Sequence, residues 1–342
     1  NVKITGLKFS SVNNKPSSWL DNSKGLYSNV SFEIGNSIVQ NCEFEQIESV
    51  RVTNSTYTLI ENCRFVDCAQ CVTGSESSDT YVVNCAFSGL DYTGNLAHCI
   101  YFSGNTSGIY IDGCTFKKCL YYPIQIYNSD NNKKNPLDAI VRNCSILESA
   151  TAIATNCSKI HIENCNIKSI TESPYGNNGI YIGGSNPDIS VKNSEFESAN
   201  SLFGFASDCL NPVVNITGCS CKNVRIFTNT VNNITYKSSS NTYNSISNAT
   251  MYTLSRITDI YSVNDIYRVS NFSSSDSLIT RTSSDVKIKI IGSLHEYNGV
   301  MIWDKTGSGQ NIILTNNTII GGRVAYGFTP IETSSNNNVV VN

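Results

Sequence analysis

Acid–base chemistry in this chain would depend on very few side chains, because the sequence contains only three histidines. His98 is the best placed of them, since it lies directly before a strand-like segment that contains Tyr101. An imidazole titrates near neutral pH and can both accept and release a proton. We therefore predict His98 and Tyr101 as catalytic residues, with a structural hydrogen-bonding role for His98 as the alternative. We expect His161 in a ladder strand and His295 in a turn, both as structural or surface residues.

Two carboxylates on predicted loops could complete such a site. Asp91 lies in the first of two long insertions and Glu172 in the second. A glycoside hydrolase needs two carboxyl groups that face each other across the scissile bond. A lyase needs a base near a sugar C5 atom, which His98 or a tyrosine would supply, and a cation that neutralises the uronate. We predict Asp91 and Glu172 as further catalytic residues and leave the choice between hydrolysis and elimination open.

Sugar binding would use a different set of residues, an exposed stripe of tyrosines and polar side chains. Aromatic rings stack on sugar rings, while amides and hydroxyls bond to sugar hydroxyls. The stripe is predicted to contain Arg51, Val72, Tyr101, Gln125, Ile153 and Tyr181, with Tyr127 slightly further on and Tyr175 in the second insertion. We predict Arg51, Gln125, Tyr127, Tyr181 and Tyr175 as substrate-binding residues, Arg51 being a cation that would neutralise a uronate. The alternative is an ordinary β-sheet surface, on which tyrosine is simply favoured.

A sequence repeat must position these residues. Its step is an Asn-Cys pair that comes shortly after an apolar residue and is separated by one residue from a following Phe or Ile. The steps are Asn41-Cys42, Asn62-Cys63, Asn84-Cys85, Gly113-Cys114, Asn143-Cys144, Asn164-Cys165, Asn193-Ser194 and Gly218-Cys219. Self-similarity at a period of this kind is typical of solenoid folds.

A second short strand follows each step, and together they predict a parallel β-helix. Alternation along each strand would send Ile, Cys and Phe inward, where stacked coils align them in columns. The Asn before each Cys is expected at a bend, because Asn tolerates the left-handed conformation and its amide can bond to the next coil. The fourteen cysteines are expected to be buried free thiols that act as small apolar residues.

The predicted fold is all-β, a single right-handed parallel β-helix of roughly a dozen coils. We expect residues 1–236 to form its regular part, residues 237–285 irregular or decorated coils, and residues 286–342 further coils. A separate small domain in the middle stretch is the alternative. Because the chain starts inside a strand-like pattern, we expect its N-terminal cap to lie upstream, in a longer protein.

The overall composition excludes several classes of function. The net charge is −3 and there is no dense run of Lys and Arg, so the electrostatic footprint of a nucleic-acid-binding protein is absent. No apolar run approaches the length of a membrane span. We predict no zinc site and no cofactor, since the histidines are scattered. Calcium is the alternative, although the sequence shows no clear cluster of carboxylates for it.

The Asn-Cys-x-Phe steps and the Gly-Ile-x-Ile segment at Gly179–Ile182 resemble the pectin-lyase-like superfamily of right-handed β-helices. Within it, the chain looks most like bacteriophage tailspikes and polysaccharide depolymerases. The resemblance covers most of the chain and is specific to the fold. The Asp-Asp, Gly-His-Gly and Arg-x-Lys segments of polygalacturonases are missing, as is the calcium-binding carboxylate cluster of pectate lyases. Neither mechanism can therefore be carried over residue by residue.

The resemblance implies a protein of the virion surface or extracellular space that binds and depolymerises a cell-surface polysaccharide. Two alternatives stay open: a non-catalytic structural or receptor-binding fibre or adhesin, and a secreted bacterial polysaccharide lyase or glycoside hydrolase. The expected partner is a glycan. The tailspike resemblance also implies a homotrimer, whereas a monomer would favour the secreted enzyme.

Overall fold

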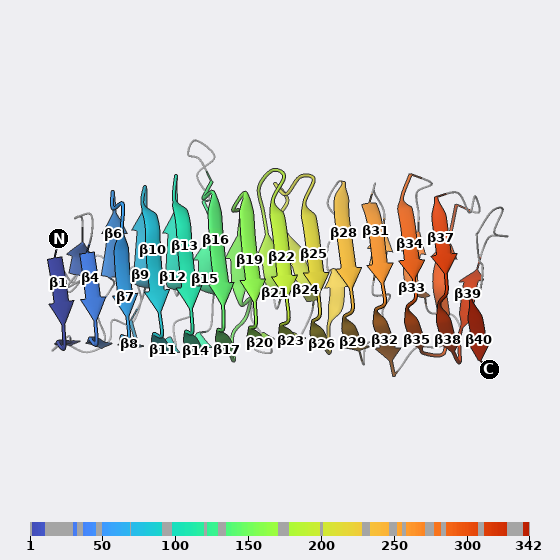
Figure 1. Ribbon diagram of the computed structural model, residues 1–342, viewed down its shortest axis with the longest axis horizontal. Helices are drawn as coiled ribbons and strands as arrows, with labels where there is room; N and C mark the ends of the chain where they lie inside the picture. The colour runs from blue at the N-terminus through green and yellow to red at the C-terminus, as the bar shows by residue number, and fades with distance from the viewer. Residues whose placement is uncertain are drawn as a thin grey trace.

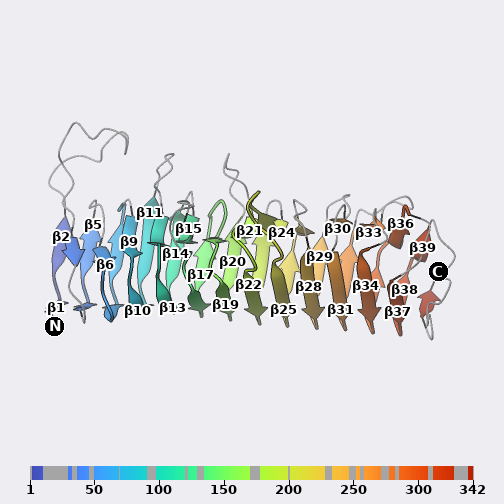
Figure 2. The same ribbon diagram turned by 90° about the horizontal axis from the view of Figure 1, so that it is seen from above.

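The computed structural model describes residues 2–10, 30–32, 37–45, 50–68, 70–90, 98–119, 122–128, 135–169, 178–198, 201–227, 233–245, 252–254, 258–270, 277–281, 285–306, 311–326 and 338–341. Every regular element in these ranges is a β-strand. The strands stack along one axis, with β1 and β40 at opposite ends of the stack (Figures 1 and 2). Each strand pairs in parallel with the strand one coil later, so that each coil adds one strand to each sheet. The predicted parallel β-helix is confirmed.

The first sheet contains thirteen strands and forms one face of the stack. Its strands alternate buried and outward residues, as Thr58–Glu61 do. The strands are β1 (Val2–Thr5), β4 (Ser37–Gln40), β7 (Thr58–Glu61), β10 (Ser78–Val83), β13 (Ser107–Asp112), β16 (Asp138–Arg142), β19 (Lys159–Glu163), β22 (Asp188–Lys192), β25 (Val213–Thr217), β28 (Ile234–Ser239), β31 (Thr258–Val263), β34 (Lys287–Ile291) and β37 (Ile312–Thr315).

The second sheet follows the first after the Asn-Cys bend and contains fourteen strands. These are β2 (Lys8–Ser10), β5 (Glu43–Glu45), β8 (Arg64–Val66), β11 (Ala86–Leu90), β14 (Thr115–Cys119), β17 (Ser145–Leu147), β20 (Asn166–Ser169), β23 (Glu195–Ser198), β26 (Ser220–Lys222), β29 (Thr242–Ser245), β32 (Ile266–Val269), β35 (Leu294–Glu296), β38 (Thr318–Ile320) and β40 (Val339–Val341).

The third sheet contains the second short strand of each repeat, and nine strands pair in it. They are β3 (Val30–Phe32), β6 (Val50–Thr53), β9 (Gln70–Ser75), β12 (His98–Ser103), β15 (Tyr122–Ile126), β18 (Ile153–Thr155), β21 (Asn178–Ile182), β24 (Ser201–Phe205) and β27 (Arg225–Phe227). A four-stranded sheet takes this position in the later coils, with β30 (Tyr252–Leu254), β33 (Ser277–Arg281), β36 (Val300–Asp304) and β39 (Arg323–Tyr326).

The asparagines of the repeat form the bend between the first and second sheets. Asn41, Asn62 and Asn84 have φ of 53°, 52° and 52°, in the left-handed region that Asn tolerates best among residues with a side chain. Gly113 takes the same place with φ of 65°. The backbone N–H of Asn41 donates to the Glu61 carbonyl of the next coil at 3.1 Å. The predicted bend is therefore confirmed, and it turns the chain at the same point of each coil.

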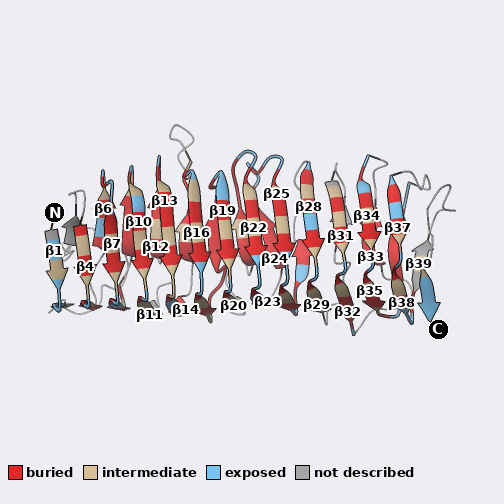
Figure 3. Cartoon of the chain, in the orientation of Figure 1, coloured by how far each residue is buried: buried red, intermediate tan, exposed pale blue. Residues whose placement is uncertain are grey.

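The cysteines and phenylalanines after this bend form the interior columns. Figure 3 shows buried and more exposed residues alternating along many of the strands. Phe44, Phe65, Phe87 and Phe116 stack with ring centroids 4.8 Å to 4.9 Å apart and are at most 1% exposed. The Cys63 thiol donates to a backbone carbonyl of the preceding coil, at 3.7 Å. All fourteen cysteines are buried free thiols, as predicted.

Later coils keep the columns but change the residues that fill them. Cys221 follows Phe196 in register, and Tyr243, Tyr267 and His295 come next, with rings that stack at centroid distances of 5.0 Å and 5.2 Å. The cysteine column continues as Asn241, Asp265, Ser293 and Asn317, all buried. The prediction of His295 in a turn was wrong, because it lies fully buried in β35. Within 237–285, β29, β31 and β32 extend the first and second sheets, and β30 and β33 belong to the four-stranded sheet.

Candidate functional site on the third sheet

One column of side chains runs along the outer face of the third sheet. It consists of Arg51, Thr73, Tyr101, Gln125, Ala154, Tyr181 and Gly204, which are paired in register from coil to coil. Val72 and Ile153, which we predicted in this column, are fully buried and belong to the core. Both strands carry apolar or small residues on both faces, so alternation alone could not assign their inward side.

The structure brings His98 and Tyr101 together. His98 is the first residue of β12 and is 3% exposed. Its ring lies 5.3 Å from the ring of Tyr101 and is nearly parallel to that of Tyr122, at 5.9 Å. Because the imidazole is covered, a substrate can reach it only if its surroundings move. A catalytic role for His98 and Tyr101 stays a prediction.

Two polar side chains flank Tyr101 in the column. Thr73 Oγ1 and Gln125 Oε1 are both buried atoms with no hydrogen-bond partner among the described residues. Such atoms are few in folded proteins, because an unsatisfied buried polar group costs about 1–3 kcal/mol. Both atoms lie beside Tyr101 and are covered by the surrounding protein.

Tyr127 follows β15 and reaches across two coils. Its hydroxyl donates to the Asp208 carboxylate at 3.5 Å, a contact between residues 81 positions apart. A Cβ atom at Gly183 would lie only 2.7 Å from this hydroxyl, so the absence of a side chain there makes room for the ring. Burial raises the pKa of Tyr127 well above its usual range, and the nearby Asp208 carboxylate raises it further. The hydroxyl therefore stays protonated at neutral pH and acts as a donor.

A buried amide holds the backbone beside Tyr127. Asn156 accepts a hydrogen bond from the Asn128 N–H at 2.9 Å and donates to the Asn128 carbonyl at 2.7 Å. It also donates to Asn135 Oδ1 at 3.2 Å. Because Asn156 is 3% exposed, these bonds are shielded from water and fix the chain directly after Tyr127.

The other predicted residues are distributed along the same face. Arg51 is two strands from Tyr101 in register, which corresponds to roughly 9–10 Å. Tyr181 is three strands from Tyr101 on the other side. It lies close enough to Tyr127 for the negative charge of an ionised Tyr181 to raise the pKa of Tyr127. Asp91, Glu172 and Tyr175 lie outside the described residues.

Asp208 is the residue of this face that sequence reasoning missed. It lies after β24, two positions beyond Ala206, which occupies the place of Tyr127 in its coil. No signal in the sequence points to it, since no local pattern links residues so far apart. With Asp208 included, the face offers hydroxyl and amide donors, a carboxylate and tyrosine rings. Among the described residues no group of three or more His, Cys, Asp or Glu side chains is placed to hold a metal ion. The described part also contains no helix long and apolar enough to cross a bilayer.

Comparison with known proteins agrees with this architecture. A family model described as a right handed beta helix region matches residues 1–137. The chain is a right-handed parallel β-helix. It is similar to the tailspike protein gp49 from Pseudomonas phage LKA1, with 14% sequence identity and a TM-score of 0.40. That alignment covers 87% of this chain and 51% of the tailspike, so the chain spans about half of its length. No curated protein sequence matches the chain.

Proposed function

We propose that the outer face of the third sheet binds a polysaccharide. The observation that carries the proposal is the Tyr127 side chain, which crosses two coils to bond to Asp208 and lies over Gly183. A tyrosine held in this way presents an aromatic ring beside a hydroxyl donor and a carboxylate acceptor. Sugars need this combination, because their rings stack on aromatic surfaces and their hydroxyls both donate and accept hydrogen bonds.

A linear glycan would run along the helix axis. The column repeats at the strand spacing of about 4.8 Å, so successive sugars would meet side chains from successive coils. In this proposal Tyr127 and Tyr181 stack on sugar rings and Gln125 bonds to sugar hydroxyls. Arg51, which is exposed at the N-terminal end of the column, would neutralise an acidic sugar, and Tyr175 would add a contact from the second insertion.

Binding is tested with labelled polysaccharides, using a panel of acidic and neutral bacterial surface glycans. Tyr127→Ala should weaken binding of the glycans that the wild type recognises by roughly tenfold to a hundredfold, as for a central interface aromatic. Tyr110→Ala is the matched control, because Tyr110 is a half-buried tyrosine on the first sheet that stacks on Tyr81 at 4.7 Å. Equal losses in the two variants, or no binding by the wild type, would refute the proposal.

Cleavage of the bound glycan is the finer part of the proposal. His98 or Tyr101 would act as acid or base, with Asp91 and Glu172 as carboxylate partners. Assays for new reducing ends and for unsaturated products would separate a hydrolase from a lyase. If products form, His98→Ala and Tyr101→Ala should abolish them with unchanged thermal unfolding. Activity that survives both substitutions would contradict the assignment.

A receptor-binding protein without catalysis is the second candidate. The burial of His98 favours it, because a general acid must reach its substrate. Glycan binding without any cleavage product would support this candidate and rule out the enzyme. For either candidate we propose a site of action outside the cell or on a virion surface. A homotrimer in light scattering would favour a spike, whereas a monomer would favour a secreted protein.

A further inference from the structure

A ladder of charged side chains runs along the outer face of the second sheet. Its members, paired in register from coil to coil, are Lys168, Glu197, Lys222, Asn244, Arg268 and Glu296. The sign of charge alternates along this charge ladder except at Asn244, where a neutral amide stands between two cations. Lys168 pairs with Glu197 at 3.8 Å, and Arg268 pairs with Glu296. The alternation therefore lacks one negative charge, at Asn244.

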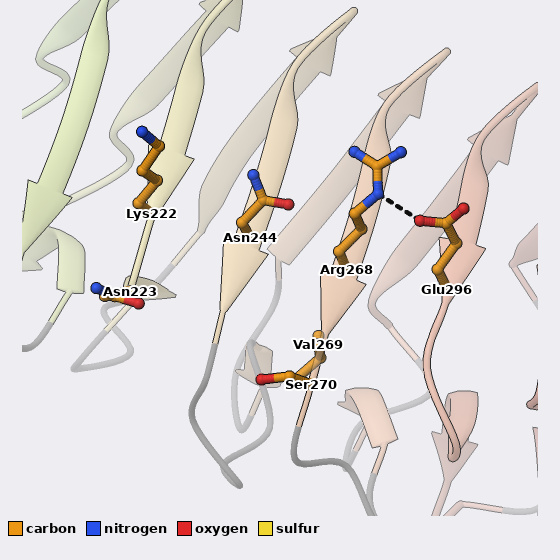
Figure 4. Close-up of a pocket in the computed structure, with 7 residues that line it drawn as sticks. All are labelled: Lys222, Asn223, Asn244, Arg268, Val269, Ser270 and Glu296. Carbon is orange, nitrogen blue, oxygen red and sulfur yellow. Dashed lines mark hydrogen bonds and ion pairs between the residues drawn. The ribbon is translucent and has the colours of Figure 1, made fainter.

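The surface is hollowed at this same point. A cavity of about 520 Å³ is lined by Lys222, Asn244 and Arg268, together with Asn223, Val269, Ser270 and Glu296. In Figure 4 the side chains of Lys222, Asn244 and Arg268 project from three successive strands toward the same side. Lys222 and Arg268 are exposed, and Lys222 makes no ion pair with any residue that the structure describes.

We propose that this hollow binds the carboxylate of an acidic sugar in a polysaccharide, seated over Asn244 between Lys222 and Arg268. The two cations stand two strand spacings apart, roughly 9–10 Å, so an anion midway lies within reach of both long side chains. The Asn244 amide supplies a hydrogen-bond donor beneath it. A nucleic acid fits less well, because its dense phosphates would meet only two cations on a chain of net charge −3. This second site lies on a different face from the third-sheet column and does not depend on it.

The test uses fluorescein-labelled polygalacturonate and the same polymer after reduction of its carboxyl groups, at low salt. Wild-type protein should bind polygalacturonate roughly tenfold more tightly than the reduced polymer, as expected for a charge-assisted contact. Asn244→Asp places a fixed carboxylate between the two cations and should remove that preference. Lys222→Gln should weaken polygalacturonate binding to a similar degree.

Matched variants distinguish binding at this site from nonspecific attraction between the polymer and the charged surface. Lys237→Gln removes an exposed lysine of the first sheet and should leave the preference within about twofold of wild type. The third-sheet site is tested by Tyr127→Ala on the binding panel and this site by Asn244→Asp and Lys222→Gln, so failure of one site is distinguishable from failure of the other. Equal affinity for the two polymers, no binding of polygalacturonate, or full preference retained by Asn244→Asp would each overturn the proposal.

Discussion

Acidic pH should destabilise the later coils through His295. This residue is fully buried, its ring stacks on Tyr267 at 5.2 Å, and its Nδ1 atom is hydrogen bonded to the Tyr297 hydroxyl at 3.1 Å. Burial lowers the pKa of His295 from 6.5 to about 3. Because one pKa unit corresponds to 1.36 kcal/mol, charging this ring inside the fold would cost up to about 5 kcal/mol.

The sign of the pH effect follows from which state binds the proton first. The folded pKa is depressed, so the unfolded chain takes up a proton while the folded chain does not. Stability is therefore fully present above about pH 6.5 and falls by about 1.4 kcal/mol per pH unit as the pH drops toward 3. Urea unfolding followed by circular dichroism between pH 7.5 and 4 measures this slope. His295→Gln, which keeps a neutral polar group near Tyr297, should flatten it.

The control for this prediction is His161→Gln on the first sheet. The His161 side chain is 26% exposed, so its replacement leaves the core intact and controls for the loss of a histidine as such. Other titrating groups contribute equally to wild type and variant and cancel in the difference. A His295→Gln variant with the same acid slope as the wild type would refute the reasoning, because the slope would then come from elsewhere.

Substitutions at three further positions have definite expected outcomes. Gly183→Ala should displace the Tyr127 hydroxyl, which lies 2.7 Å from the added Cβ, and lower the pKa of Tyr127 toward its ordinary value while stability changes by less than about 1 kcal/mol. An unchanged titration of Tyr127 in ¹³C-tyrosine NMR would contradict this. Phe87→Ala should cost about 3–5 kcal/mol in urea unfolding and Phe87→Leu clearly less, because Phe87 stacks between two rings in the core. Similar losses in both variants would argue against the stack. Asp265→Asn should raise the thermal midpoint at pH 7, since burial raises the pKa of Asp265 and a neutral amide, as at Asn241 in the same column, avoids the buried charge. A raised folded pKa means that stability is lost as pH rises, so this gain should shrink at acid pH, and a lower midpoint at pH 7 would contradict the account.

The regular coils could be predicted because the residues that shape each coil lie close together in the sequence. Asn62, Cys63 and Phe65 each perform one task, namely the bend, the narrow corner and the stacked ring, and the same three residue types recur in coil after coil. A period that repeats both the residue types and their spacing specifies the coil without knowledge of distant contacts.

The later coils were harder to predict because different residues perform the same tasks. Asn241 and Asp265 replace the cysteines with a buried hydrogen-bonded pair, in which the Asp265 carboxylate accepts from the Asn241 N–H at 2.8 Å. Tyr267 and His295 replace the phenylalanines as stacked rings. The geometry is conserved along the stack, but the residue types are not, and a pattern of residue types alone does not reveal the equivalence.

The candidate site also contains residues that could be placed from the sequence and one that could not. Tyr101, Gln125 and Tyr181 could be placed on one outer column, because alternation within each strand determines which side chains face out. Asp208 could not, because its partnership with Tyr127 joins coils that are far apart in the sequence. A contact between side chains of different coils depends on the length of the side chain and on small residues that leave room for it. The repeat pattern does not specify either of these.

The central claim, that the outer face of the third sheet recognises a glycan, is tested most directly by a crystal structure with a bound oligosaccharide. The oligosaccharide should come from whichever polysaccharide of the binding panel the wild-type protein recognises. The account predicts sugar rings along β15, β18 and β21, in contact with Tyr127 and Tyr181 and with hydroxyls bonded to Asp208. Sugar density on the first-sheet tyrosines Tyr81 and Tyr110, with none on the third sheet, would contradict it.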